Sequence, residues 1–365
     1  MLSKVLHINS YYLTNRLHYF FCTFSDVNSN SYFIPVYKNA VNVYDAVLRQ
    51  GQKVYKIYGG LDKRIFFTKI FKCCFVAARR YDIGKHQFIH AHTLFSDGLP
   101  AFLLANLYRK KLLITVRNTD VHFFIKRSPV FRLLGEYVLS TAYLVFVPSY
   151  AYQKHLVEQY PFLQQKGKVR VLRNGVAPFW IENAFLRTCC TGNASVKLLF
   201  VGRVEKDKNL QVLINYLQQY TIGNGIVLNI VGENRQGLNF SGIQGLRKGN
   251  AIVYHGRIAD EKTLLHFYRS CDVFILLSFR ETFGVSYVEA MTQSLPIIYS
   301  RGEGIDGFFS NGCVGYACAP DDMHELHEVL TRVMDNYETI SRNAYTESLK
   351  FNWKNIVTEY ENMLC

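Results

Sequence analysis

The feature that most restricts the fold is a series of short, continuously apolar runs separated by segments of helix length. In the first half these runs are KVLHI (4–8), VYKIY (54–58), FIHAH (88–92), KLLITV (111–116), YLVFV (143–147) and KVRVLR (168–173). In the second half they are VKLLFVG (196–202), IVLNIVG (226–232), AIVYHG (251–256), VFILL (273–277) and PIIYS (296–300). Runs that are apolar throughout are typical of parallel strands covered on both faces. Two successive sets of strands alternating with helices therefore predict two doubly wound α/β domains.

The length of 365 residues also favours two domains, because a single hydrophobic core rarely grows to that size. We predict a first domain over residues 1–175 and a second over 196–345. Between them, the poorly periodic segment 176–195 follows the turn signal Asn174-Gly175 and is predicted to be a linker. The last segment, 346–365, is predicted to hold an amphipathic helix. Its apolar residues, at helical spacing, are Trp353, Ile356, Val357, Tyr360 and Met363.

Charge is distributed unevenly along the chain. Residues 1–175 hold 25 Lys and Arg against 8 Asp and Glu, a balance of +17, whereas 176–365 hold 17 against 20, a balance of −3. The two halves are therefore expected to meet different partners. Nine cysteines, with no Cys-x-x-Cys pair, fit a reducing compartment. No run suits a signal peptide or a membrane span, so we expect a cytoplasmic protein without an integral anchor.

Two phrases of the second half carry candidate chemistry. In VGRVEKDKNLQVLI (201–214), Gly202 permits a tight turn after a strand, and Arg203 and Lys208 follow at the edge where open α/β sheets bind ligands. Two cations there suit a diphosphate, although solvated loop charges are an equally good explanation of this phrase alone. The phrases VGEN (231–234) and HGRI (255–258) each end a strand at a glycine, where a base or ribose could approach the backbone, but such turns are common.

The second phrase, SFRETFGVSYVEAMTQSLPIIYS (278–300), joins a strand to a helix expected to start near Gly284–Val285. The first N–H groups of such a helix favour an anion. Glu281 precedes the helix and could accept hydrogen bonds from sugar hydroxyls, and Glu289, within it, could accept them from a ribose. A surface glutamate and an ordinary helical glutamate would explain any random pair.

The whole chain resembles glycosyltransferase family 4, the retaining nucleotide-sugar transferases of GT-B fold. The motifs that carry this resemblance are ETFGVSYVEA followed by SLPII, GRVEKDKN, RNGV, HAHTLFSDGLPAFLLA (90–105) and FNWKNIVTEY. The resemblance implies two Rossmann-like domains facing across a cleft, with the C-terminal helix crossing back to pack on the N-terminal, acceptor-binding domain.

The resemblance also implies roles in the C-terminal, donor-binding domain. Arg203 and Lys208 would neutralise the donor diphosphate beside Gly202. The N–H groups of Val285 and Ser286 would bind its distal phosphate. Glu281, with Phe283 and Gly284, would hold the sugar and Glu289 the ribose, while the base would rest near Arg257 and Ile258.

The first half departs from the family pattern at two places. HINSYYLTNR, after the first strand, lacks the glycine-rich loop of many relatives, so the N-terminal phosphate loop is not assigned. After KLLITV, Arg117 stands where relatives often have a histidine. We expect Asp120 and Arg117 beside the reacting centre, and His92, Asp120 and His122 near the acceptor. A buried structural role is an equally good explanation of His92.

The implied reaction is transfer of a sugar from a nucleoside diphosphate to a hydroxyl, with retained configuration, on a glycan or polyprenyl-diphosphate-linked saccharide in surface polysaccharide synthesis. Arg203, Lys208 and the helix N-terminus would stabilise the leaving diphosphate. No Asp-x-Asp phrase occurs, so we expect no metal and no cofactor. Two alternatives are a GT-B sugar-nucleotide epimerase, which would need its own acid–base carboxylates, and a basic nucleic-acid-binding protein, for which no reading motif occurs.

The basic half points to a membrane partner. Residues 62–80, DKRIFFTKIFKCCFVAARR, are predicted to form one helix. Its basic side would carry Lys69, Lys72, Arg79 and Arg80, and its apolar side Phe66, Phe67, Ile70, Phe71, Cys74 and Ala77. Such helices lie on anionic lipid surfaces, which would place the protein peripherally on the inner face of the cell membrane. An ordinary core-facing helix with a solvated basic side is the alternative.

Overall fold

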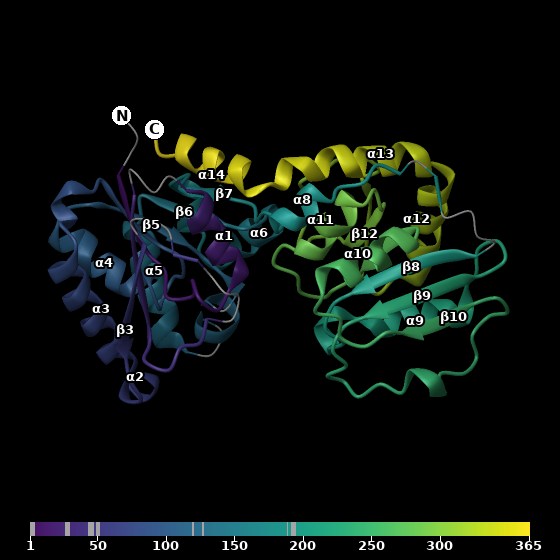
Figure 1. Ribbon diagram of the computed structural model, residues 1–365, viewed down its shortest axis with the longest axis horizontal. Coiled ribbons are helices and arrows are strands. Elements are labelled where there is room, and N and C mark those ends of the chain that lie inside the picture. Colours follow the sequence, from purple (N-terminus) through teal and green to yellow (C-terminus); the bar gives the residue numbers. More distant parts are fainter. Residues whose placement is uncertain are drawn as a thin grey trace. The chain divides into compact units, whose positions relative to one another are not determined.

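The structure is a computed structural model that describes residues 4–365 except 26–29, 43–46, 49–51, 119, 126–127, 188 and 191–194, and the side chains of Lys63, His122 and Phe123. The chain forms two compact units (Figure 1). The first contains residues 1–148, 153–175 and 353–365, and the second contains 149–152 and 176–352. The segment predicted as a linker, 176–195, thus groups with the second unit.

The first unit is built on a seven-stranded sheet in the order β3-β2-β1-β4-β5-β6-β7, with every neighbouring pair parallel. The strands are β1 (Val5–Ile8), β2 (Ser31–Tyr37), β3 (Gln52–Tyr58), β4 (Phe88–Ala91), β5 (Lys111–Thr115), β6 (Leu144–Val147) and β7 (Val169–Val171). The chain runs outward from β1 through β3 and then returns to β4 beside β1. The order therefore reverses between β1 and β4, as in doubly wound folds.

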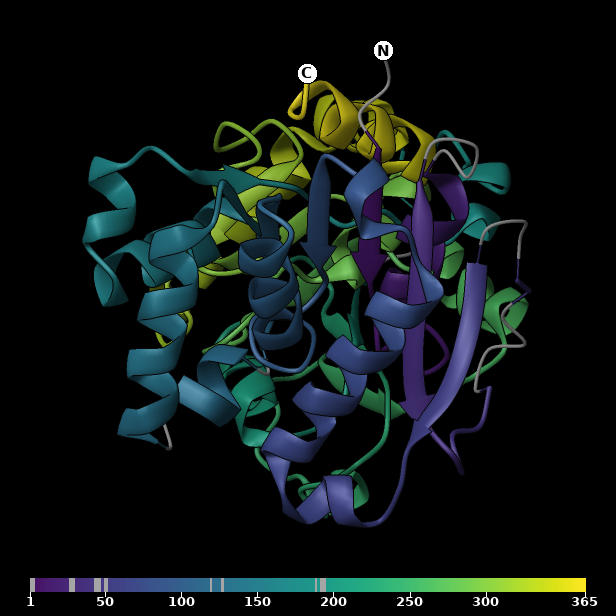
Figure 2. The same cartoon turned by 90° about the vertical axis from the view of Figure 1, so that its left-hand side faces the viewer.

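Helices cover this sheet and come from both ends of the chain. They are α1 (Arg16–Phe24), α2 (Leu61–Arg64), α3 (Phe66–Arg80), α4 (Gly98–Leu107), α5 (Pro129–Thr141), α6 (Tyr150–Gln159), α7 (Phe162–Gln165) and α14 (Trp353–Asn362), with a 3-10 turn at Ile83–Lys85 and a π-helix at Asp120–Ile125. Helix α14 confirms the predicted terminal helix and packs on α1, with Trp353 and Tyr360 buried. Helices α3, α4 and α5 are successive neighbours in one layer (Figure 2).

The second unit has a six-stranded parallel sheet in the order β10-β9-β8-β11-β12-β13. Its strands are β8 (Val196–Val201), β9 (Ile226–Val231), β10 (Ala251–Tyr254), β11 (Val273–Leu276), β12 (Ile297–Ser300) and β13 (Gly315–Cys318). Its helices are α8 (Pro178–Glu182), α9 (Leu210–Gln219), α10 (Glu261–Ser270), α11 (Val285–Thr292), α12 (Met323–Asp335) and α13 (Tyr337–Ser348), with short 3-10 turns at Lys206–Lys208, Phe240–Gly242 and Leu349–Phe351. Here the order reverses between β8 and β11.

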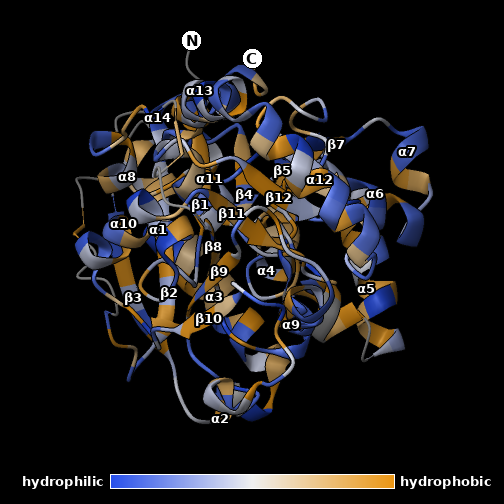
Figure 3. Cartoon of the chain, turned by 90° about the vertical axis from the view of Figure 1, so that its right-hand side faces the viewer, coloured by the Kyte–Doolittle hydropathy of each residue, from blue (hydrophilic) through white to orange (hydrophobic). Residues whose placement is uncertain are grey.

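Apolar strands form the centre of each unit, as the sequence predicts. Figure 3 shows several strands, among them β2 and β12, largely in the hydrophobic colour, and the helices with hydrophobic and hydrophilic residues alternating along them. In the second unit the core includes Trp180 of the predicted linker, whose ring packs edge-to-face on Tyr268 at 5.2 Å. Within the described residues, no helix combines the length and apolar character needed to cross a bilayer.

The segment 62–80 differs from its prediction in two ways. It is not one helix, because Ile65 has extended backbone angles and separates α2 from α3. Its two sides are also not separated as predicted: Lys69, predicted on the basic side, is buried. On the predicted apolar side, Ile70 and Ala77 are buried, whereas Phe67 and Phe71 are exposed.

Two tyrosine rings account for the burial of Lys69. The Lys69 ammonium lies 5.0 Å from the ring centroid of Tyr58 and 5.7 Å from that of Tyr37, so aromatic faces replace part of its hydration. Burial lowers the pKa of Lys69. The side of α3 that meets the sheet also carries Cys73 and Ala77, whose small side chains let the helix approach closely.

Candidate functional site

The candidate donor site lies where the strand order of the second sheet reverses. Strands β8 and β11 are parallel neighbours, so the loops that follow them, 202–209 and 277–284, leave the same edge of the sheet side by side. In open α/β sheets, ligands bind at this point, outside the carboxyl ends of the strands. The two phrases singled out in the sequence occupy these two loops.

Three polar contacts hold the two loops together. The Phe279 N–H donates to the Asp207 carbonyl at 2.9 Å, and the Arg280 guanidinium pairs with the Asp207 carboxylate at 2.7 Å. The third contact joins two predicted site residues: Lys208 Nζ lies 2.6 Å from Glu281 Oε2, with side chains only 16% and 14% exposed. A predicted phosphate ligand and a predicted sugar ligand thus form one ion pair.

Glu281 is further positioned by the loop after β12, which the sequence analysis did not identify. The Glu281 N–H donates to Glu303 Oε2 at 2.8 Å, and the Gly304 N–H donates to the Glu281 carbonyl at 2.9 Å. Gly304 has φ +55, and a Cβ there would lie 2.7 Å from Glu281 Cγ. A residue with a side chain would displace Glu281, so glycine is required at this position. The Gly-x-Gly of residues 302–304 after a strand was the available signal.

Helix α11 begins beside this ion pair, at Val285, which confirms the predicted start. Its N-cap is Gly284, with φ +79, and no side chain caps the first turn. A Cβ on Gly284 would lie 2.4 Å from the Tyr287 ring, so glycine is needed to let the chain turn into the helix. The amide groups of Val285 and Ser286 belong to this uncapped first turn, and the helix dipole adds partial positive charge there.

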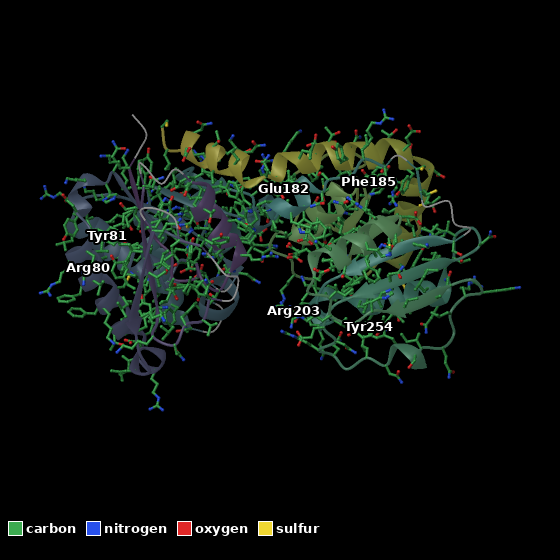
Figure 4. All side chains as sticks on the ribbon, viewed as in Figure 1. Arg80, Tyr81, Glu182, Phe185, Arg203 and Tyr254 are labelled. Carbon is green, nitrogen blue, oxygen red and sulfur yellow. The ribbon has the colours of Figure 1, made fainter. Side chains whose placement is uncertain are left out.

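The other predicted donor residues are spread around this site. Glu289, one turn further along α11, accepts a hydrogen bond from the Tyr268 hydroxyl at 3.1 Å. Phe283 is buried and packs on Phe308 and Phe351, so its ring lies in the hydrophobic core. Arg203 follows β8 and Gly202, is about half exposed (Figure 4), and pairs with Glu205 at 3.0 Å.

The predicted base site lies after β10. Arg257 is exposed and Ile258 half-buried, in the loop between β10 and α10. Within the second unit, whose residues from 195 onward are all described, no hydrogen bond or ion pair joins Arg203 or Arg257 to the Lys208–Glu281 pair. Lys208, Glu281 and the first turn of α11 are therefore brought together, whereas the two arginines stand apart from them in the ligand-free structure.

In the first unit, the strand order reverses between β1 and β4, and Asp97 bridges the loops after these strands. Its Oδ1 accepts from the Ser10 N–H at 3.1 Å and its Oδ2 from the Thr93 hydroxyl at 3.2 Å. Burial raises the pKa of Asp97 to about 6. This residue was not among the predicted ones, although the Asp-Gly after a strand could have drawn attention to it. It secures the glycine-free loop after β1.

Asp120 and Arg117 are adjacent, as their spacing requires, and their side chains contact other groups of the protein. Asp120 is buried, and its Oδ2 accepts from the backbone N–H groups of Leu94 at 3.0 Å and Arg117 at 2.9 Å. Burial raises the pKa of Asp120 to about 7. The Arg117 guanidinium donates to Asn174 Oδ1 at 2.9 Å. The side chain of His122 lies outside the described residues.

His92 belongs to a buried group of imidazoles. Its Nε2 lies 3.1 Å from Nδ1 of His7, and its ring stacks on His90 at 4.4 Å. His90 in turn is hydrogen-bonded to Thr115 at 2.8 Å and to the Tyr360 hydroxyl at 2.9 Å. Burial lowers the pKa of all three histidines, that of His7 to about 3.

These three imidazoles are the one group found in the described part of the chain that could hold a metal ion. Both ring nitrogens of His90 already have protein partners, however, and His7 and His92 are hydrogen-bonded to each other. The arrangement therefore serves as hydrogen-bonded packing between β1, β4 and α14, which matches the structural explanation of His92.

Residues 193–348 match the family described as "Glycosyl transferases group 1". A probable sucrose-phosphate synthase of Thermosipho melanesiensis is 28% identical over 47% of this chain and 41% of its own length. An uncharacterized 41.2 kDa protein in the cps region of Klebsiella pneumoniae is 24% identical over 76% of this chain and 78% of its own length. The capsular polysaccharide biosynthesis glycosyltransferase CapM of Staphylococcus aureus is 26% identical over 45% of this chain and 44% of its own length. The chain thus spans less than half of two of these relatives.

Solved structures match over nearly the whole chain. A glycosyltransferase from Rickettsia africae superposes with a TM-score of 0.74 at 15% identity, covering 99% of this chain and 97% of that one. Anabaena Alr3699/HepE, in complex with UDP and glucose, gives a TM-score of 0.68 at 17% identity, covering 99% of both chains. These likenesses show that the fold is the GT-B arrangement of two Rossmann-like units, as predicted.

Proposed function

We propose, from the match of residues 193–348 to the family described as "Glycosyl transferases group 1", that this chain transfers a sugar from a nucleoside-diphosphate sugar to a hydroxyl group with retention of configuration. The observation that carries the proposal is the Lys208–Glu281 ion pair at the uncapped start of α11, where the second sheet reverses its order. The cation and the helix N-terminus suit a phosphate, and the carboxylate suits the hydroxyl groups of a sugar.

In the proposed reaction, the bond between the sugar C1 and the phosphate oxygen breaks while C1 bonds to the acceptor oxygen. The negative charge that develops on the leaving diphosphate is stabilised by Lys208, by Arg203 turning from Glu205, and by the amides of Val285 and Ser286. The acceptor proton passes to a leaving phosphate oxygen on the same face of the sugar. Glu281 accepts hydrogen bonds from sugar hydroxyls and Glu289 from the ribose, so neither acts as a nucleophile. Because cationic side chains neutralise the diphosphate, we expect no requirement for a divalent cation.

Two relatives support a place in surface polysaccharide synthesis: the CapM protein, whose name gives capsular polysaccharide biosynthesis, and the Klebsiella protein of the cps region. We propose a glycan or polyprenyl-diphosphate-linked saccharide as the acceptor, at the inner face of the cell membrane. The Anabaena complex with UDP-glucose makes UDP-sugars the first donors to test.

The test is a panel of UDP-, GDP- and ADP-sugars, scored by the rise in melting temperature and by slow donor hydrolysis in EDTA. One nucleotide class should stabilise the protein. Arg203→Ala should abolish the response to the sugar donor, and Glu281→Ala should weaken that response and abolish donor hydrolysis. Arg342→Ala, which removes an exposed arginine paired with Glu338 on α13, is the matched control and should respond like the unchanged chain. Full turnover by either site variant would refute the site, and conversion of the donor sugar without an acceptor would indicate an epimerase.

A further inference from the structure

Three neighbouring helices of the first unit turn large apolar side chains to solvent. On α3, Phe67, Phe71 and Phe75 follow one another at intervals of four residues and are 64%, 74% and 50% exposed. The outward side of α4 carries Leu103 and Leu107, and that of α5 carries Val130, Leu133 and Tyr137. Because α3 contacts α4 and α4 contacts α5, these residues belong to one layer, which we term the three-helix face. Single exposed apolar residues are ordinary, but eight on adjacent helices mark a surface with a partner.

The charges of the three-helix face are mainly positive, with the exposed Glu136 as the exception. Helices α3 and α4 contain no acidic residue, and Glu136 is the one acidic residue of α5. The exposed basic residues on or beside these helices are Arg64, Arg79, Arg80, Arg109, Lys111 and Arg132. The Arg79 guanidinium lies 4.4 Å from the ring centroid of Phe75, and Arg80 stands at the outer end of α3 (Figure 4). Aromatic side chains and arginines are thus interleaved on one surface.

We propose that the three-helix face docks on an anionic lipid bilayer, with the α3 phenylalanines entering the headgroup region and the basic residues contacting the phosphates. Aromatic rings with nearby basic side chains are favoured at the interface between headgroups and acyl chains. A second copy of the chain is a poorer occupant, because a two-fold interface would bring like charges together. The inference rests on the proposed function in one respect: it supplies a means of reaching a lipid-linked acceptor.

Three variants of the full chain test this proposal. Phe67→Ser/Phe71→Ser/Phe75→Ser removes the apolar ridge, and Arg79→Gln/Arg80→Gln removes two charges. The control, Val253→Ser/Lys248→Gln, makes the same kinds of change at exposed positions of the second unit. Binding is measured by flotation with vesicles of phosphatidylcholine alone or mixed with phosphatidylglycerol, at low and high salt.

We expect the unchanged chain to bind the mixed vesicles and not those of phosphatidylcholine alone, and high salt should weaken this binding. The affinity for the mixed vesicles should fall by at least about tenfold in the phenylalanine variant, and by about fivefold for each arginine removed in the arginine variant. The control should bind like the unchanged chain. Equal recovery of all proteins, or recovery that does not depend on anionic lipid, would overturn the proposal. So would light scattering that shows dimers of the unchanged chain and monomers of the phenylalanine variant, because the face would then be a contact between copies.

Donor binding separates this inference from the proposed function. The phenylalanine variant should keep the melting-temperature response to the donor, because its substitutions lie in the other unit from Lys208 and Glu281. Vesicle binding without any response to nucleotide sugars would refute the enzymatic proposal and leave the docking surface standing. A full donor response without vesicle binding would refute the docking surface alone.

Discussion

Replacing Glu281 by Gln should separate binding of the nucleoside diphosphate from binding of the sugar attached to it. In the ligand-free structure Glu281 neutralises Lys208 at 2.6 Å. At an effective dielectric constant of about 20, the Coulomb attraction over this distance is about 6 kcal/mol. Dehydration of both groups offsets most of it, so a hydrogen-bonded charge pair contributes about 1.5–3 kcal/mol net.

A diphosphate that recruits Lys208 must compete with this interaction. Without the carboxylate the competition disappears, so affinity for the free nucleoside diphosphate should stay unchanged or rise by up to about tenfold, the equivalent of about 1.4 kcal/mol. The attached sugar loses its strongest acceptor, and charged hydrogen bonds to hydroxyls contribute about 1.5–3 kcal/mol. The ratio of the two affinities should therefore fall by at least about tenfold.

Isothermal titration with the nucleotide identified in the donor panel, with and without its sugar, measures this ratio. Glu325→Gln is the matched control, since Glu325 is a carboxylate of the same unit that pairs with Arg301. The control should leave both affinities unchanged. An equal loss of affinity for the two ligands in Glu281→Gln would refute the reasoning, because Glu281 would then support the phosphate site without contacting the sugar.

Two further predictions concern Gly304 and acid stability. Gly304→Ala should lower turnover at least about tenfold more than Gly302→Ala in steady-state kinetics. Both glycines have positive φ, but only a Cβ at position 304 would meet Glu281. Equal losses in the two variants would show that backbone strain alone causes the effect. Acidification from pH 7 to pH 5 should destabilise the first unit. The four buried histidines 7, 18, 90 and 92 have lowered pKa values, so the unfolded chain takes up protons that the folded chain refuses. The raised pKa values of Asp97 and Asp120 act in the opposite direction, since their folded forms take up protons first as the pH falls. The histidines outnumber the carboxylates, so the free energy of unfolding in urea should drop by about 4 kcal/mol, and a rise instead would show that the histidines are not held neutral.

The sequence predicts the two-unit fold well, because buried parallel strands need continuous apolar runs. The two strands it missed have physical reasons. Strand β2 lies inside the first sheet, yet Pro35 interrupts its run, and proline usually excludes an interior strand. Strand β13 has four residues, starts at Gly315 and carries a half-buried Tyr316, so it offers little periodicity. Both β2 and β13 form because they pair with neighbouring strands of their sheets, and not because their own residues favour a strand.

The burial of Lys69 was missed for a related reason. Its place among other basic residues at helical spacing predicts a solvated side chain, but the tyrosine rings that bury it belong to the strands β2 and β3. The same limit applies to the site. The loops of Lys208 and Glu281 could be found because each follows its own strand, whereas Glu303 and Asp97 act through contacts with distant loops.

The residues at the place where the strand order reverses differ between the two sheets, and this difference indicates which unit can stabilise the leaving group. In the first unit, Asp97 and Asp120 are buried and accept hydrogen bonds from backbone or Thr93, so their carboxylates hold loops in place. In the second unit, Lys208 and Glu281 keep some exposure, and an uncapped helix begins beside them. A leaving diphosphate needs positive charge that is already oriented and can be redirected to it, and the second unit provides this. We therefore propose that the first unit contributes shape and acceptor contacts, and we expect the charge-dependent part of the barrier to respond to substitutions at residues 203–289 far more than to substitutions around Asp120.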